Sequence, residues 1–172
     1  LDSAGSLRPG AIPLGERISS RRGPHSRRAR RQGRGSRTPE PPVSTVVVDA
    51  SVLVDALVGS DAGDVHGHLG DRPLMAPAHV DAEVLSALRG LMLGKHLSRQ
   101  RCRDALLDFH ELPLDRWALT PILTDRAFDL ADSMTAYDAL YVAMAELADA
   151  PLVTRDARLA RAAKRMVEVE LI

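Results

Sequence analysis

Apolar and polar positions along residues 43–172 follow patterns that predict alternating strands and helices. Val46-Val47-Val48 is a continuous β-branched run, which is typical of a strand buried on both faces. Apolar residues at spacings of three and four predict helices, and short apolar runs between them predict further strands. The predicted helices cover residues 51–58, 61–70, 80–92, 98–109, 125–134, 135–147 and 157–164, and the predicted strands cover residues 46–48, 74–76, 112–119, 151–154 and 167–171.

The order of these elements indicates the fold class. Strands and helices alternate along the chain, which favours an α/β fold with a central, mostly parallel sheet and helices on both faces. Residues 167–171 alternate apolar with acidic side chains, a pattern typical of a strand at the edge of a sheet. Residues 80–109 are expected to form a helical hairpin.

The first 42 residues lack these patterns. They are rich in Arg, Gly, Ser and Pro, and such a segment cannot bury enough apolar surface to offset the entropy lost on ordering. We therefore predict a disordered extension at residues 1–42 and one globular domain at residues 43–172. A further hypothesis is that the extension is absent from the native protein, because a GUG start codon at Val43 would be read as methionine. Mass spectrometry of the native N-terminus tests it.

Charge is distributed unevenly between these two parts. Residues 1–42 carry ten Arg and three acidic residues, whereas residues 43–172 carry 13 basic and 20 acidic residues, although the formal net charge is zero. A domain rich in carboxylates repels a polyanion unless bound cations or the basic extension intervene.

Cysteine content and hydropathy indicate where in the cell the protein is expected. Cys102 is the single cysteine, so no internal disulfide can form, which suits a reducing compartment. No uninterrupted apolar run approaches the ~18 residues that span a bilayer. We therefore expect a soluble cytoplasmic protein in which Cys102 is a small apolar core residue.

Four carboxylates occupy equivalent positions in the predicted elements. Asp49 and Asp156 directly follow strands, and Glu83 and Asp138 lie in the first turns of helices. In a parallel α/β sheet the carboxyl ends of strands and the N-termini of the following helices lie on one edge, so we expect the four to share a cleft. Because clustered carboxylates repel one another, protons or divalent cations must neutralise them. Oxygen-only ligands favour Mg²⁺ or Mn²⁺ over Zn²⁺.

Each carboxylate also has a purely structural interpretation. Asp49 is placed to act as the N-cap of the helix that starts near Ser51. Asp138 completes a capping box with Thr135, in which the acidic third residue bonds back to the backbone of the cap. These interpretations account for one residue at a time, whereas a shared site accounts for all four.

The acidic residues lie in four sequence blocks, which are VVVDASVLV at 46–54, PAHVDAEVLSALR at 77–89, TAYDALYVAMAE at 135–146 and LVTRDARLA at 152–160. In these blocks the chain resembles the PIN-domain ribonucleases, most closely the VapC-type toxins of bacterial toxin–antitoxin pairs. The resemblance implies a PIN-like α/β/α sandwich, Mg²⁺- or Mn²⁺-dependent cleavage of RNA, and a homodimer.

The same resemblance implies the residues of the site and a protein partner. The acidic metal-binding set would be Asp49, Glu83, Asp138 and Asp156, with Thr154 supporting the site and Ser51 assisting near the first aspartate. A VapB-type antitoxin would lay a peptide along the toxin and reach the acidic cleft with a basic side chain. We expect that contact on the predicted helical hairpin. Arg155 and Arg158 are candidates for contacts with the RNA backbone.

Two other functions are weighed against this one. An aspartyl-phosphate phosphatase or a receiver domain also places Asp after the first strand of an α/β sheet. A phosphatase with a nucleophilic Asp would carry a second acid two residues later, where this chain has Ser51. The remaining alternative is a non-catalytic PIN-like module that binds RNA or protein. The presence of an acid in all four blocks argues against it.

Overall fold

A single sheet of five parallel strands forms the centre of the computed structural model, which describes residues 44–172. The order across the sheet is β3-β2-β1-β4-β5, so β1 is the central strand. This arrangement confirms the predicted α/β class. The predictions made for residues 1–42 and for Val43 lie outside the described residues. The strands are β1 (Val46–Val48), β2 (Leu74–Pro77), β3 (Leu114–Trp117), β4 (Leu152–Thr154) and β5 (Val169–Leu171).

The three valines of β1 explain its central place. All three are fully buried, as expected for a strand that is covered by helices on both faces. Val47 lies between Met75 of β2 and Leu152 of β4 in the parallel register. Asp49 therefore leaves the sheet at its centre rather than at an edge.

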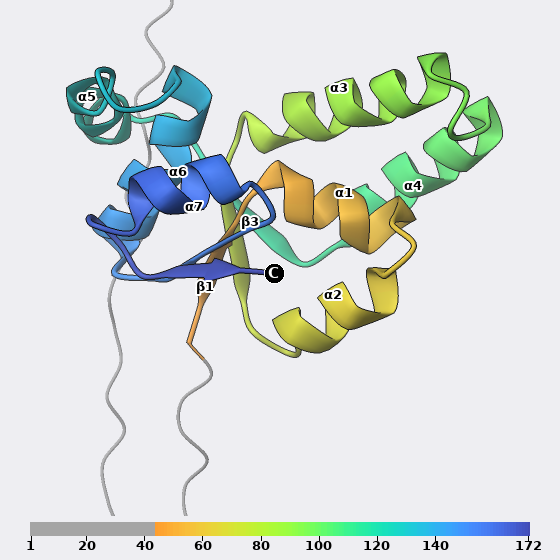
Figure 1. Cartoon of the computed structure of the whole chain (residues 1–172), viewed down its shortest axis with the longest axis horizontal. Coiled ribbons are helices and arrows are strands. Elements are labelled where there is room, and N and C mark those ends of the chain that lie inside the picture. Colours follow the sequence, from red (N-terminus) through yellow and green to blue (C-terminus); the bar gives the residue numbers. More distant parts are fainter. Residues whose placement is uncertain (1–43) are drawn as a thin grey trace, which may run out of the picture. The chain divides into compact units, whose positions relative to one another are not determined.

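Helices cover both faces of the sheet (Figure 1). Strand order runs from β1 to β2 and β3 in one direction, and the chain then returns to β4 and β5 on the other side of β1. Because parallel crossovers are right-handed, this reversal places α1 to α4 on one face and α5 to α7 on the other, as Figure 1 shows. The helices are α1 (Ala50–Val58), α2 (Ala62–Leu69), α3 (Val80–Leu93), α4 (Arg99–Glu111), α5 (Pro121–Asp129), α6 (Ala136–Ala148) and α7 (Ala157–Ala163).

The middle of α6 is buried on all sides. Seven consecutive residues from Ala139 to Ala145 are buried, including Tyr141 and Met144. A helix that is apolar all round must lie inside the protein. Contacts with β1, β2, β4 and α5 place α6 between the sheet and another helix. The buried middle of α6 thus fixes the helix against the sheet, and its first turn, with Asp138, follows from that placement.

The bounds predicted for the fifth helix are wrong. The prediction covered residues 125–134, whereas α5 begins at Pro121 and ends at Asp129. Thr120 caps the helix by accepting a hydrogen bond from the Leu123 N–H at 3.4 Å, and proline is well suited to the first helical position. The apolar residues beyond 129 that suggested a longer helix lie in turns instead.

Other predicted features are confirmed. The α3–α4 hairpin forms, and Ser98 caps α4 by accepting a hydrogen bond from the Arg101 N–H. Cys102 is a buried core residue, and β5 is an edge strand although it begins only at Val169. Within residues 44–172, no helix combines the length and apolar character needed to cross a membrane.

Candidate functional site

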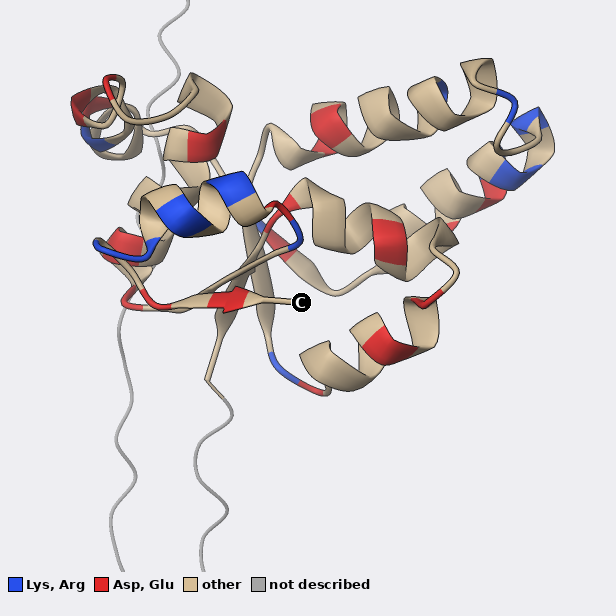
Figure 2. Cartoon of the chain, viewed as in Figure 1, with Lys and Arg blue, Asp and Glu red and all other residues tan. Residues whose placement is uncertain are grey.

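The four predicted acidic residues line one open cleft at the carboxyl edge of the sheet. The cleft has a volume of about 520 Å³ and lies where the chain reverses its direction across the sheet. Acidic segments, red in Figure 2, mark the start of α1 and the first turn of α3, while α7 carries basic residues in blue. Such a reversal point is where open α/β sheets bind their ligands. The lining residues are Asp49, Ala50, Ser51, Val54, Asp55, Glu83, Ser86, Ala87, Asp138 and Asp156.

Asp49 lies at the floor of the cleft and is only 8% exposed. Although it holds the N-cap position of α1, its side chain makes no capping hydrogen bond. Its Oδ2 atom instead accepts hydrogen bonds from Ser51 Oγ at 2.6 Å and from Thr154 Oγ1 at 2.8 Å. The N-cap interpretation is therefore wrong for Asp49, and the predicted support by Thr154 and Ser51 is present in the geometry.

Burial raises the pKa of Asp49, because the charged carboxylate is removed from water. The hydrogen bonds from Ser51 and Thr154 oppose this effect, and the negative charge of Glu83 adds to it. A cation in the cleft would relieve both the loss of hydration and the repulsion between the two carboxylates.

Glu83 reaches the cleft from the first turn of α3. Its Oε2 atom accepts a hydrogen bond from the Tyr141 hydroxyl at 2.6 Å and lies 3.3 Å from His79 Nε2. Burial alone would raise the pKa of Glu83, but the contacts with His79 and Tyr141 outweigh it, and the pKa is lowered. Glu83 is consequently held ionised beside the buried Asp49.

Asp138 and Asp156 are tied to one basic residue. Arg158 Nη2 lies 3.4 Å from Asp138 Oδ2 and 3.7 Å from Asp156 Oδ2. Only half of the predicted capping box forms, because Thr135 accepts a hydrogen bond from the Asp138 N–H while the Asp138 carboxylate faces Arg158. The Arg158 side chain is 68% exposed, so little holds it in this position.

Asp156 is the one acid of the four whose carboxylate caps a helix. Its Oδ1 atom accepts hydrogen bonds from the N–H groups of Arg158 at 2.7 Å and Leu159 at 3.1 Å. These bonds at the start of α7 lower the pKa of Asp156. Oδ2 remains the oxygen that faces Arg158.

Arg155 occupies a different environment from the one proposed for it. Its Nη1 atom lies 3.0 Å from Asp55 Oδ2 and 2.7 Å from Asp61 Oδ2, and its backbone N–H donates to Ser51 Oγ at 3.1 Å. Arg155 thus ties the loop that carries Asp156 to Asp55 in α1 and to Asp61 at the start of α2. Its guanidinium is engaged with protein carboxylates rather than facing the solvent.

Sequence reasoning missed Tyr141 and His79. Tyr141 lies three positions after Asp138, and residues at this spacing share one face of a helix, so a signal was present. His79 directly precedes α3 and contacts Glu83 one turn later. The Tyr141–Glu83 contact could not be inferred before the position of α6 relative to α3 was known.

The donors fit a hard divalent cation in their chemistry. All four side chains are carboxylates, which suits Mg²⁺ or Mn²⁺. In residues 44–172, however, no group of three or more His, Cys, Asp or Glu side chains is arranged to enclose an ion. Side-chain rotations, including the departure of Arg158, would have to bring the carboxylates together.

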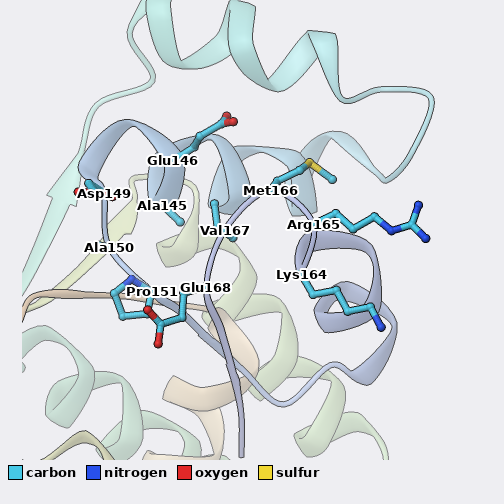
Figure 3. A pocket seen from close by; sticks show the side chains of 10 residues that line it. All are labelled: Ala145, Glu146, Asp149, Ala150, Pro151, Lys164, Arg165, Met166, Val167 and Glu168. Carbon is cyan, nitrogen blue, oxygen red and sulfur yellow. The ribbon is translucent and has the colours of Figure 1, made fainter.

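A second hollow lies away from the four acids, at the end of α6 and the connection from α7 to β5 (Figure 3). Its volume is about 350 Å³. Lys164 and Arg165 extend away from it in Figure 3, and Glu146 is paired with Arg126. No set of polar groups converges there. It is lined by Ala145, Glu146, Asp149, Ala150, Pro151, Lys164, Arg165, Met166, Val167 and Glu168.

Known proteins resemble this chain in sequence and in fold. The PIN domain family model matches residues 46–165. Ribonuclease VapC12 from Mycobacterium tuberculosis is 37% identical over 128 residues, covering 74% of this chain and 98% of the relative. Ribonuclease VapC1 from the same species is 40% identical over 128 residues, covering 73% of this chain and 96% of the relative.

Two solved structures have the same fold at low sequence identity. VapBC2 from Rickettsia felis, bound to a DNA fragment from its promoter, superposes with a TM-score of 0.55 at 16% identity, covering 74% of this chain and 98% of that one. FitAcB from Neisseria gonorrhoeae superposes with a TM-score of 0.58 at 15% identity, covering 73% and 96%. Because the family match spans nearly all of the described residues and the relatives align over almost their whole length, the chain belongs to the PIN domain family and, within it, to the VapC proteins.

Proposed function

We propose that this protein is a metal-dependent endoribonuclease and the toxin of a toxin–antitoxin pair. The observation that carries the proposal is the convergence of four carboxylates on one cleft, from the end of β1, the first turns of α3 and α6, and the start of α7. The relatives that are named ribonucleases support the reaction class. A cleft lined by acids suits phosphodiester cleavage only when a cation reverses the local charge.

Asp49 and Asp138 would bind Mg²⁺ or Mn²⁺ directly, and Glu83 and Asp156 would bind it directly or through water. The chemistry supplied by such an ion is activation of a water for attack on phosphorus and stabilisation of charge on the leaving oxygen. Thr154 and Ser51 keep the buried Asp49 carboxylate in one orientation through their hydrogen bonds to Oδ2.

Arg158 has a role in substrate binding under this proposal. It neutralises Asp138 and Asp156 in the cation-free cleft, and its exposed side chain can turn away when a cation takes its place. The released guanidinium would then face the solvent beside the cleft, where a phosphate of the RNA backbone must pass.

A VapB-type antitoxin is the partner that we propose. The α3–α4 hairpin exposes the apolar side chains of Leu85, Leu93 and Leu107, which a peptide could contact. A basic side chain of that peptide would pair with the carboxylates. We also propose that the protein is a homodimer. We further propose that it is located in the cytoplasm, because the free Cys102 is typical of a reducing compartment.

The first prediction tests the ribonuclease. RNA incubated with Mn²⁺ and the full chain should be cut, and Asp49→Asn should reduce cleavage at least about 100-fold because a ligand of the ion is lost. Product formation on a denaturing gel measures this, with EDTA as the control. Equal activity of the two proteins, or activity in neither, would contradict the proposal. RNA binding without cleavage by the wild type would favour the non-catalytic alternative.

A further inference from the structure

Asp49 and Glu83 are each held through one oxygen of the carboxylate, Asp49 by two hydrogen bonds and Glu83 by one. In each carboxylate one oxygen has two protein neighbours, namely Ser51 and Thr154 at Oδ2 of Asp49, and Tyr141 and His79 at Oε2 of Glu83. Among residues 44–172, no hydrogen bond occupies Oε1 of Glu83. Since Glu83 lines the cleft, Oε1 is the oxygen available to a ligand there.

Tyr141 is an unusual donor because its hydroxyl is buried deep inside the protein. Its side chain is 1% exposed in the interior of α6, and it donates to Glu83 at the short distance of 2.6 Å. Burial raises the pKa of Tyr141, and the hydrogen bond to Glu83 raises it further, so the hydroxyl keeps its proton. The hydroxyl therefore acts as a permanent donor that fixes one glutamate oxygen.

His79 packs behind this contact. Its side chain is 9% exposed, its ring lies edge-on to Tyr141 with centroids 5.0 Å apart, and it makes no capping hydrogen bond at the start of α3. Within residues 44–172 neither ring nitrogen of His79 has a hydrogen-bond partner, so its 3.3 Å approach to Glu83 is a contact without a hydrogen bond. A role in capping does not explain this buried ring, whereas its place against both Tyr141 and Glu83 restricts the movement of the two side chains.

We propose that Tyr141 is a positioning residue that holds Glu83 in the orientation needed to bind a divalent cation, with His79 supporting it. This inference rests on the proposed function. A glutamate has three rotatable bonds, and fixing its orientation beforehand reduces the entropy lost on binding. Groups that hydrogen-bond to metal ligands commonly change metal affinity or activity by about 10–100-fold.

The second prediction concerns Tyr141→Phe, which removes the hydroxyl and keeps the ring. We expect Mn²⁺ binding to the full chain, measured by isothermal titration calorimetry without RNA, to weaken about 10-fold or more. Tyr137→Phe is the matched control, because Tyr137 lies on the same helix, is 60% exposed, and donates no hydrogen bond to an acid of the cleft. Its Mn²⁺ affinity should equal that of the wild type.

A double-mutant cycle separates positioning from a general loss of structure. In a Glu83→Gln background, Tyr141→Phe should cause no further loss of Mn²⁺ affinity, because its effect passes through the Glu83 carboxylate. If Tyr141→Phe does not fold, His79→Phe replaces it in the same cycle, with a smaller loss expected. An unchanged Mn²⁺ affinity in the folded variant, additive losses in the cycle, or no Mn²⁺ binding by the wild type would overturn the inference.

The two proposals fail in different experiments. Unchanged Mn²⁺ binding by Tyr141→Phe, together with RNA cleavage that Asp49→Asn abolishes, would overturn the positioning role alone. Weakened Mn²⁺ binding that depends on Glu83, in a wild-type protein that cuts no RNA, would support the positioning role and overturn the ribonuclease.

Discussion

Burial sets Asp49 apart from the other acids of the cleft at the scale of single residues. Its pKa is raised, whereas those of Glu83 and Asp156 are lowered by groups that donate hydrogen bonds to them. Ser51 and Thr154 offset only part of the lost hydration. An ionised Asp49 therefore destabilises the folded protein as long as no cation is bound, a cost that is common at functional sites.

The third prediction follows from this cost. An aspartate whose native pKa lies above its ordinary value of 3.8 makes the folded state less stable as pH rises through the interval between the two values. In EDTA at pH 7, Asp49→Asn should therefore stabilise the protein by on the order of 1 kcal/mol, which raises Tm by about 2–4 °C. Thermal unfolding between pH 4 and 8 should show the gain shrinking in acid. A lower Tm at pH 7 would contradict the prediction.

The acids of the site could be predicted from sequence, but their environments could not. Asp49 and Asp138 were identified because parallel topology fixes which ends of elements meet. Whether a carboxylate caps a helix depends on its side-chain rotamer. One rotamer meets the backbone N–H groups of the next turn, and another meets donors from distant parts of the chain. Asp156 takes its local backbone donors, whereas Asp49 takes the hydroxyl of Thr154, which is 105 positions away in the chain. Such contacts appear only after the elements have packed.

At the scale of elements, the edge strand β5 is held in two ways. It pairs with β4 in the sheet, and its Glu170 side chain also forms ion pairs with residues at the end of α2. Arg72 donates to both carboxylate oxygens of Glu170 in β5, at 2.8 and 3.0 Å, and His68 Nε2 lies 2.8 Å from Glu170 Oε2. This cluster ties the end of α2 to the edge strand. An edge strand whose side chains are charged and ion-paired is also less prone to pair with a strand of another molecule.

The fourth prediction tests this attachment through pH. The hydrogen bond from Arg72 is the main cause that lowers the pKa of Glu170. A lowered native pKa contributes stability above the ordinary value of 4.5, and that stability is lost as pH falls through the native value. Glu170→Gln should thus cost up to about 1 kcal/mol at pH 7, since the group is partly exposed, and less at pH 3 than at pH 7.

Chemical unfolding at the two pH values measures the effect of Glu170→Gln. Glu168→Gln is the control, because Glu168 is exposed and forms no ion pair within the described residues. Equal destabilisation by Glu170→Gln at pH 7 and pH 3 would mean that the carboxylate charge does not contribute.

Most elements could be predicted because local signals agreed with the packing. Ser98 and Thr135 start their helices as expected, and the valines of β1 form the central strand. The predicted bounds of α5 were wrong because the spacing of apolar residues beyond Asp129 was given more weight than Thr120-Pro121, which marks the start of the helix. Apolar residues in a turn that faces the core, such as Leu130, repeat helical spacing without being helical. Periodicity alone cannot separate these cases.

At the scale of the whole molecule, the electrostatics of the chain oppose its proposed substrate. The domain at residues 43–172 has seven more acidic than basic residues, and the first 42 residues have an excess of seven basic ones. Local cations change the sign of the charge in the cleft, but long-range attraction of RNA must come from elsewhere. The basic extension is the part of the sequence that can supply it.

The fifth prediction is that deleting residues 1–42 leaves Mn²⁺-dependent cleavage intact but weakens RNA binding. The family match begins at residue 46, so the deleted segment lies outside it. Binding of RNA to Asp49→Asn, followed by fluorescence anisotropy across a salt series, should show a smaller salt slope after the deletion. Replacing the ten Arg of the segment by Gln should have the same effect. An unchanged slope would exclude an electrostatic role.

The pairing of β1 with β4 also decides when, during synthesis, the acidic cleft can form. Asp49 is made early, but the hydroxyl that holds its carboxylate belongs to Thr154, 105 positions later, and Asp156 follows two residues after it. A growing chain keeps the central strand open on one side until β4 has left the ribosome. The cleft that we propose as the active site therefore cannot be complete until the chain has been made at least as far as Asp156.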